Sequence, residues 1–121
     1  MSKTEVKDIK ENAKGLFAKQ NIKKGSLITV LKGKIFSKPT RTSIQIQDKH
    51  HIEDLEGGYM NHHCDPNADI IIKNGEYALV VAKRYVVDGE EITFDYETTE
   101  AELSPPFECD CHGRLIKGRG R

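Results

Sequence analysis

Two cysteines separated by a single residue could bind a metal ion. They are Cys109 and Cys111, and a third cysteine, Cys64, lies near the middle of the sequence. In a chain that begins without an export signal, closely spaced thiols indicate metal thiolates rather than a disulfide framework. Structural zinc usually takes four ligands, and His112, directly beside Cys111, is a strained fourth candidate. Zinc held by the three cysteines is therefore one interpretation, for which the fourth ligand is missing.

A polar stretch at residues 57–67 could bind a ligand through hydrogen bonds. It places four hydrogen-bonding side chains within one loop, between two apolar patches: Asn61, His62, Asp65 and Asn67. Such a loop must satisfy many backbone groups without a regular ladder. An ordinary polar loop closed by an Asp-Pro turn is the alternative. Metal binding by the adjacent His-His-Cys run is the weaker interpretation, because neighbouring side chains rarely reach one ion together.

A tyrosine near residue 96 could place a hydroxyl at a reacting centre. In a strand, Ile92, Phe94 and Tyr96 share one face, because successive side chains alternate. At the end of that face a phenol can pack its ring and still present its hydroxyl to a cleft. A core tyrosine bonded to a backbone carbonyl is the alternative that the residues leave open.

Short apolar runs separated by turn signals must position these side chains. Strict alternation at residues 43–47 predicts a half-buried strand. The Asn74–Gly75 pair predicts a hairpin that joins residues 70–72 to residues 77–82. Only residues 97–103 favour a short turn of helix. The sequence therefore predicts a mostly β domain.

Length and charge restrict the class of protein. The 121 residues fit one domain, and 19 Lys and Arg balance 19 Asp and Glu. This balance disfavours direct nucleic-acid binding. Without an apolar run of about 20 residues or a signal-peptide core, we expect an intracellular, membrane-free domain, cytoplasmic or chromatin-associated.

The charge is nevertheless uneven along the chain. Residues 1–24 carry seven lysines and three acids, whereas residues 85–113 contain nine acids and no lysine or arginine. An acidic surface attracts a basic partner. A solvated face paired with the basic N-terminal segment is the alternative.

Taken in order, four segments resemble those of SET-domain protein-lysine N-methyltransferases. The family opens with Gly-x-Gly-Leu/Val-Phe-Ala, matched by residues 13–18, and its middle carries Asn-His-Ser-Cys-x-Pro-Asn, matched by residues 61–67. A Gly-Glu-Glu-Leu-Thr-Phe-Asp-Tyr segment is matched by residues 89–96, and a post-SET Cys-x-Cys tail by residues 109–111. The resemblance extends from about residue 12 to residue 118.

This resemblance implies a fold and an activity. The fold is mainly all-β, a β-clip-like fold of several small sheets with a knot-like C-terminal arrangement. The implied organisation is an N-terminal segment at 1–11, a SET domain at 12–98 and a post-SET-like tail at 99–121. S-adenosylmethionine is the implied methyl donor, and the acceptor is a lysine amine of a basic, histone-like protein or peptide.

The resemblance also assigns roles to residues. Tyr96 is the expected catalytic residue, and Phe94 and Tyr96 form the lysine channel. Because Phe94 has no hydroxyl to hold a water, we expect room for di- or trimethylation. The expected donor-binding residues are Lys14, Gly15, Phe17, Tyr59, Asn61, His62 and Tyr96.

Three positions depart from the family pattern. Ala13 replaces a glycine, His63 replaces a serine, and the tail lacks the final cysteine that would complete a zinc site with Cys64, Cys109 and Cys111. These departures motivate an alternative function, a catalytically inactive SET domain that binds a peptide or protein. A small metal-binding interaction protein is a third option. We also expect that such a short domain could form a homodimer to complete its groove.

Overall fold

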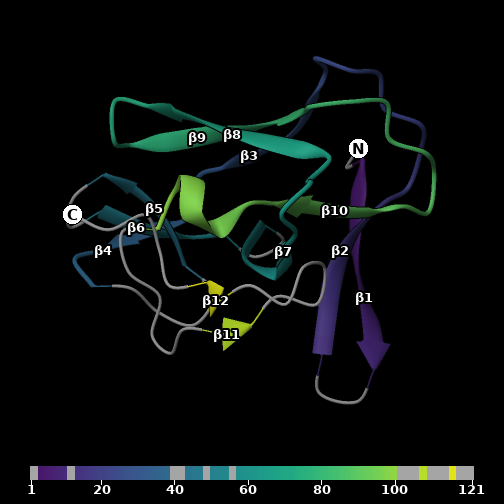
Figure 1. Cartoon of the computed structure of the whole chain (residues 1–121). Helices are drawn as coiled ribbons and strands as arrows, with labels where there is room; N and C mark the ends of the chain where they lie inside the picture. The colour runs from purple at the N-terminus through teal and green to yellow at the C-terminus, as the bar shows by residue number, and fades with distance from the viewer. Residues whose placement is uncertain are drawn as a thin grey trace.

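The chain folds into small sheets that share one core (Figure 1). The structure, a computed structural model, describes residues 3–10, 13–38, 43–47, 50–54, 57–100, 107–108 and 115–116. In these residues the strands are β1 (Thr4–Lys10), β2 (Ala13–Ala18), β3 (Leu27–Leu31), β4 (Lys34–Phe36), β5 (Ile44–Gln47), β6 (His50–Glu53), β7 (Asn61–His62), β8 (Ala68–Lys73), β9 (Tyr77–Ala82), β10 (Glu91–Phe94), β11 (Phe107–Glu108) and β12 (Leu115–Ile116). Two short 3-10 turns, η1 (Gly57–Tyr59) and η2 (Tyr96–Thr98), complete the described elements. The predicted all-β class is confirmed. No helix within these ranges is long and apolar enough to span a membrane.

One four-stranded sheet, in the order β1-β2-β10-β7, joins distant parts of the sequence. β10 runs antiparallel to β2, with Ile92 opposite Leu16. On its other side β10 runs parallel to β7, with Phe94 opposite His62. This parallel pairing brings the polar stretch at residues 57–67 beside the later segment that ends in Tyr96.

The second sheet, in the order β3-β9-β8, contains the predicted hairpin. β8 and β9 pair antiparallel from Ala68 opposite Ala82 to Lys73 opposite Tyr77. Asn74 and Gly75 have φ values of 56° and 68° in the connecting turn. Left-handed backbone of this kind suits Asn and Gly in a tight hairpin, so the local prediction is confirmed.

The third sheet, in the order β4-β6-β5, corrects one detail of the sequence analysis. Residues 44–47 do form strand β5, but Gln45 is buried together with its apolar neighbours. The backbone N–H of Gln45 donates to Oε2 of the buried Glu100 at 2.7 Å. Because residues near Glu100 cover the polar face, the strand is buried on both faces rather than on one.

The core is built from aliphatic side chains of all three larger sheets. Leu16, Leu31, Ile52, Val80 and Ile92 are fully buried. Burying a side chain of this type contributes about 1.5–3 kcal/mol relative to leaving it exposed.

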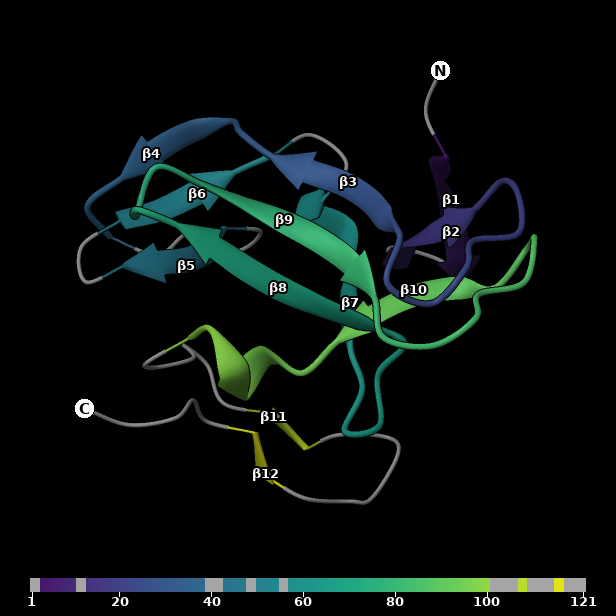
Figure 2. The same ribbon diagram turned by 90° about the horizontal axis from the view of Figure 1, so that it is seen from above.

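A short antiparallel pair, β11 with β12, lies beyond η2 and the β8 edge in the view from above (Figure 2).

Candidate active site

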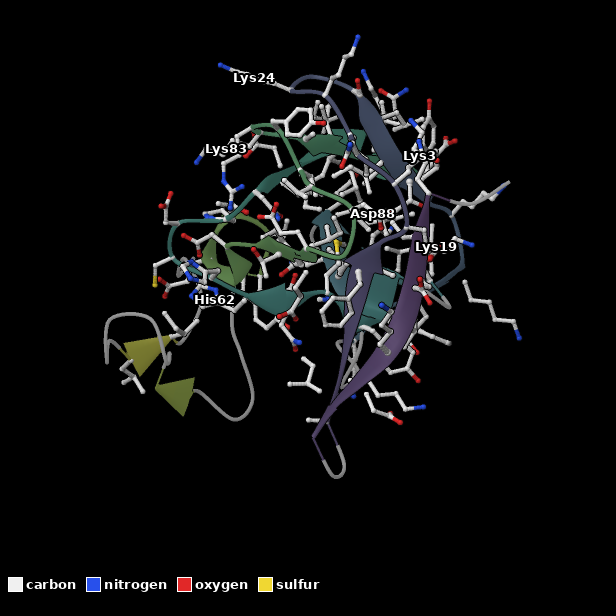
Figure 3. All side chains as sticks on the ribbon, turned by 90° about the vertical axis from the view of Figure 1, so that its right-hand side faces the viewer. Lys3, Lys19, Lys24, His62, Lys83 and Asp88 are labelled. Atoms are coloured by element: carbon white, nitrogen blue, oxygen red, sulfur yellow. The ribbon has the colours of Figure 1, made fainter. Side chains whose placement is uncertain are left out.

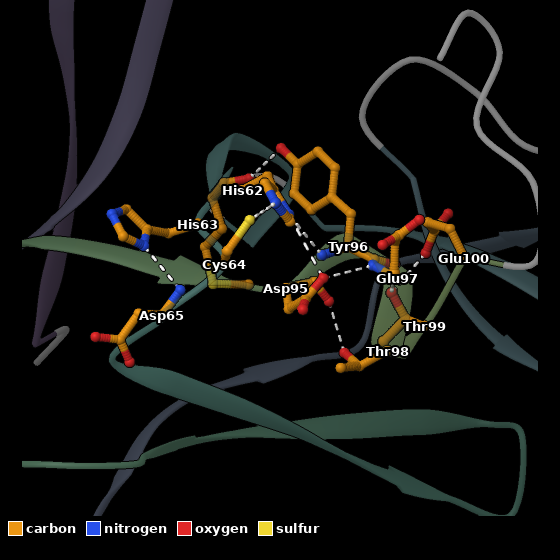
Figure 4. Close-up of polar contacts among 11 residues, drawn as sticks. His62, His63, Cys64, Asp65, Asp95, Tyr96, Glu97, Thr98, Thr99 and Glu100 are labelled. Carbon is orange, nitrogen blue, oxygen red and sulfur yellow. Dashed lines mark hydrogen bonds and ion pairs between the residues drawn. The ribbon is translucent and has the colours of Figure 1, made fainter. Parts of the chain in front are cut away.

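The ends of β7 and β10 bring the predicted tyrosine and histidine together (Figure 4). The hydroxyl of Tyr96 donates to the backbone carbonyl of Met60 at 2.7 Å. The backbone N–H of Tyr96 donates to Nδ1 of His62 at 3.0 Å, and the two rings meet edge to face with centroids 5.3 Å apart. The structure therefore places the two motifs around one point of the fold.

Tyr96 itself does not lie on the strand face that alternation suggests. Ile92 and Phe94 share a buried face as expected, but β10 ends at Phe94 and Tyr96 begins η2. Asp95 caps this turn, and its Oδ1 accepts the N–H of Glu97 at 2.9 Å. The tyrosine ring still packs on Phe94, with centroids 5.0 Å apart. The local cap, which competes with strand pairing, accounts for the difference.

The phenol of Tyr96 is held in its neutral form. Burial raises the pKa of Tyr96 to about 12, and the negative charges of Glu100 and Glu91 act in the same direction. Its bond to the Met60 carbonyl is the bond expected of a core tyrosine, yet the side chain is only partly buried. At neutral pH this group donates hydrogen bonds and does not act as a base.

The imidazole ring of His62 lies inside the protein, between the backbone of Tyr96 and the side chain of Cys64. Its side chain is only 2% exposed, and Nδ1 accepts the Tyr96 N–H. This arrangement assigns the proton to Nε2, which lies 3.3 Å from Sγ of Cys64. Asp95 Oδ1 lies 3.6 Å from Nδ1, beyond hydrogen-bond distance. The His62 ring is therefore held by contacts within the protein, and its role in donor binding stays a prediction.

Asn61 is fixed by two acceptors on neighbouring strands. Its Nδ2 donates to Oε2 of Glu91 at 2.7 Å and to the backbone carbonyl of Lys14 at 3.0 Å. A Cβ added at Gly15 would lie 2.6 Å from this Glu91 oxygen and 2.9 Å from a methyl carbon of Ile9. Both atoms are the ends of flexible side chains, so a larger residue at this position would displace Glu91 and Ile9 from their present positions.

The remaining predicted donor-binding residues lie on elements next to Asn61. Lys14 places Nζ 5.9 Å from the ring centroid of the exposed Tyr59, and Phe17 receives a similar contact from Lys7 at 5.6 Å. Strand β2 and turn η1 are in contact. Apart from Tyr96 in η2, the expected set therefore lies on β2, η1 and β7, which are neighbouring elements.

Three polar residues have structural roles that the sequence analysis did not assign. Buried Asn67 donates to the Glu91 carbonyl at 2.7 Å and accepts the Thr93 N–H at 2.9 Å, so it fixes the path of β10. Glu91 orients Asn61, and buried Glu100 accepts bonds from Gln45 and Thr99. All three depend on contacts between distant segments, and no local pattern indicates them.

The predicted metal site cannot be built from the described residues. Cys64 is partly buried, and its Sγ lies 3.3 Å from Nε2 of His62. Cys109 and Cys111 lie outside the described ranges, and within those ranges no group of three or more His, Cys, Asp or Glu side chains could hold a metal ion. Zinc binding stays a prediction.

Comparison with known proteins identifies the class that this fold and site define. A family model for the SET domain matches residues 13–97, and the chain therefore belongs to the SET domain family. The predicted family membership is confirmed.

Three curated proteins are similar to the chain. The Drosophila melanogaster histone-lysine N-methyltransferase ash1 is 30% identical over 125 residues, which cover 86% of this chain and 6% of that protein. The methyltransferase flvH of Aspergillus flavus is 32% identical over 103 residues, covering 77% of this chain and 57% of its own length. The Caenorhabditis elegans histone-lysine N-methyltransferase mes-4 is 34% identical over 76 residues, which cover 50% of this chain and 8% of that protein. The chain spans no more than 57% of the length of these three relatives.

Proposed function

We propose that the chain transfers a methyl group from S-adenosylmethionine to the side-chain amine of lysine in a basic protein or peptide. The observation that carries the proposal is the junction of β7 and β10, where a neutral Tyr96 phenol lies against His62 and close to Asn61. The names of the three relatives, all methyltransferases and two of them histone-lysine enzymes, support the same reaction.

The donor would bind where β2, η1 and β7 meet. Asn61 offers a fixed side-chain amide, Lys14 and Gly15 offer backbone beside it, and Tyr59 offers an exposed ring. S-adenosylmethionine supplies a methyl group on a positively charged sulfur. The protein's contribution is to hold the acceptor amine in line with that group, and alignment of this kind can lower a barrier by several kcal/mol, up to about 7–11 in the best intramolecular cases.

The acceptor must arrive as a cation and react as a neutral amine. A free lysine has a pKa near ~10.4, so it is charged at neutral pH. Glu91 and Glu100 act on the phenol as negative charges, and the same field favours the approach of an ammonium group. These carboxylates also hold the proton on the amine, whereas removal from water beside Phe94 and the ring of Tyr96, and repulsion by the positive sulfur of a bound donor, would favour its loss to water. Tyr96 would orient the amine through its hydroxyl.

A SET domain that binds without transferring methyl is the second candidate. It is favoured by the tail, in which the family's final cysteine is missing. This candidate requires only a bound peptide or protein, whereas the first requires turnover of the donor.

Two measurements on the full chain separate these functions. Calorimetric titration with S-adenosylmethionine tests donor binding, and incorporation of labelled methyl into a mixture of basic proteins tests transfer. We expect both to be positive. Binding without incorporation, across substrates and conditions, would favour the binding module, and failure of both would remove the proposal.

A substitution of Glu91 tests whether the donor sits beside Asn61. Glu91→Ala removes the acceptor that orients the Asn61 amide, and a charged hydrogen bond contributes about 1.5–3 kcal/mol. Donor affinity should fall by about tenfold or more. Glu76→Ala, at the exposed β8–β9 turn, is the matched control and should leave the affinity unchanged.

A further inference from the structure

Two loops from distant parts of the chain form one continuous surface. Residues 19–26 connect β2 to β3, and residues 83–90 connect β9 to β10. Ile22 and Val86, both buried, exchange two backbone hydrogen bonds of 2.8 Å. The N–H of Gly89 adds a bond of 2.9 Å to the end of β2. These contacts hold the side chains of both loops in fixed relative positions.

Half of the exposed side chains of these loops are cationic. We call them the cationic face, and its members are Lys19, Lys23, Lys24, Lys83 and Arg84, all exposed. Lys3 reaches the same region, because its Nζ donates to the Leu27 carbonyl at 2.6 Å. Figure 3 shows Lys3, Lys19, Lys24 and Lys83 on one side of the molecule, around Asp88.

The cationic face carries a net positive charge, although the formal net charge of the whole chain is zero. Residues 19–26 contain no acid, and residues 83–90 contain only Asp88 and Glu90. Glu90 is paired with Arg84 at 2.9 Å, and partial burial of its carboxyl is outweighed by bonds from Val87, Asn67 and Arg84, so its pKa is lowered. In the described residues, the side chains of Lys19, Lys23, Lys24 and Lys83 form no ion pair, so their charges are available to a partner.

We propose that the cationic face binds the phosphate backbone of a nucleic acid. Lys and Arg, with neighbouring polar side chains such as the exposed Gln20 and Tyr85, are the residue types that contact phosphates. Lysine is depleted in protein–protein interfaces, which disfavours an acidic protein as the partner. A bilayer would require a broad apolar face, whereas the exposed large apolar side chains of these two loops are Tyr85 and Val87.

The number of cations sets the expected salt dependence. Four to six phosphate contacts give a slope of log K against log salt of about −4 to −5. Affinity should therefore fall by about 10²–10³ between 50 and 200 mM salt. The binding is independent of sequence, because the face offers no element shaped for a groove.

The test is fluorescence anisotropy with a labelled duplex DNA and the full chain, without methyl donor or protein substrate. Wild type should bind at 50 mM salt with the slope given above. Lys23→Gln/Lys24→Gln should weaken binding by at least about tenfold and reduce the magnitude of the slope by up to about 2. Lys32→Gln/Lys34→Gln, an equal loss of charge beyond the other end of β3, should change neither quantity.

Several results would overturn the inference. They are no binding at 50 mM salt, an equal loss in the control variant, or displacement of the duplex by polyglutamate or anionic vesicles at the same charge concentration. Circular dichroism checks that both variants fold. Donor titration on the same variants keeps the outcomes separate, because the side chains of Lys23 and Lys24 make no hydrogen bond to the described active-site residues. DNA binding can then fail while methyl transfer stands, and the reverse.

Discussion

The raised pKa of Tyr96 makes a prediction that optical titration can test. Burial and the charges of Glu100 and Glu91 place this pKa at about 12, above the ordinary tyrosine value of 10.0. One pKa unit corresponds to about 1.4 kcal/mol, so the environment favours the neutral phenol over the phenolate by about 2–3 kcal/mol. This preference is fully present below pH 10 and is lost as the pH rises through the folded-state pKa near 12.

The assay compares phenolate absorbance of wild type and Tyr96→Phe after rapid pH jumps, before the protein unfolds. The difference between the two titrations isolates Tyr96, and we expect its midpoint near 12. Circular dichroism at each pH reports whether the fold persists. A difference curve with its midpoint at 10 in folded protein would refute the reasoning that burial and two carboxylates control this phenol.

Three further predictions concern stability. Asn67→Ala should lower the free energy of unfolding by about 2–4 kcal/mol in denaturant titration, because it leaves buried backbone groups unsatisfied, and a loss under 1 kcal/mol would contradict this. Gly33→Ala should prevent stable folding, since a Cβ there would overlap the Glu53 carbonyl, and a thermal midpoint equal to wild type would contradict it. Arg84→Gln should move acid unfolding to higher pH, because the lowered pKa of Glu90 contributes stability above pH 4.5 that is lost as the pH falls, and an unchanged acid midpoint would show that the pair contributes nothing.

Local features of the fold were predictable from the residues alone. The strand at residues 43–47 follows from alternation, and the β8–β9 hairpin follows from Asn74 and Gly75, because both signals act within a few residues. The burial of Gln45 was not predictable in this way. It depends on Glu100, which is 55 residues away in the sequence.

The candidate site shows the same division. The residue types at Asn61, His62 and Tyr96 indicated polar chemistry, and the resemblance to a family indicated which residues should meet. No periodicity predicts that β7 pairs parallel to β10, since the two strands are about thirty residues apart. The contact by which Glu91 orients Asn61 was not predictable either. The two residues are distant in the sequence, and nothing near Glu91 indicates which side chain its carboxylate contacts.

Methyl transfer by Tyr96→Phe tests directly whether the reaction takes place at the junction of β7 and β10. The measurement follows S-adenosylhomocysteine and methylated lysine together, in wild type and in the variant, with Tyr85→Phe on the cationic loops as the matched control. In wild type we expect one S-adenosylhomocysteine for each methyl group transferred. We expect the same ratio and the same rate in Tyr85→Phe. We also expect a loss of about 10²-fold or more in Tyr96→Phe, because the variant lacks the phenol oxygen that would accept an N–H of the attacking amine and orient it. Equal rates in wild type and Tyr96→Phe would contradict the assignment of the reaction to the junction of β7 and β10.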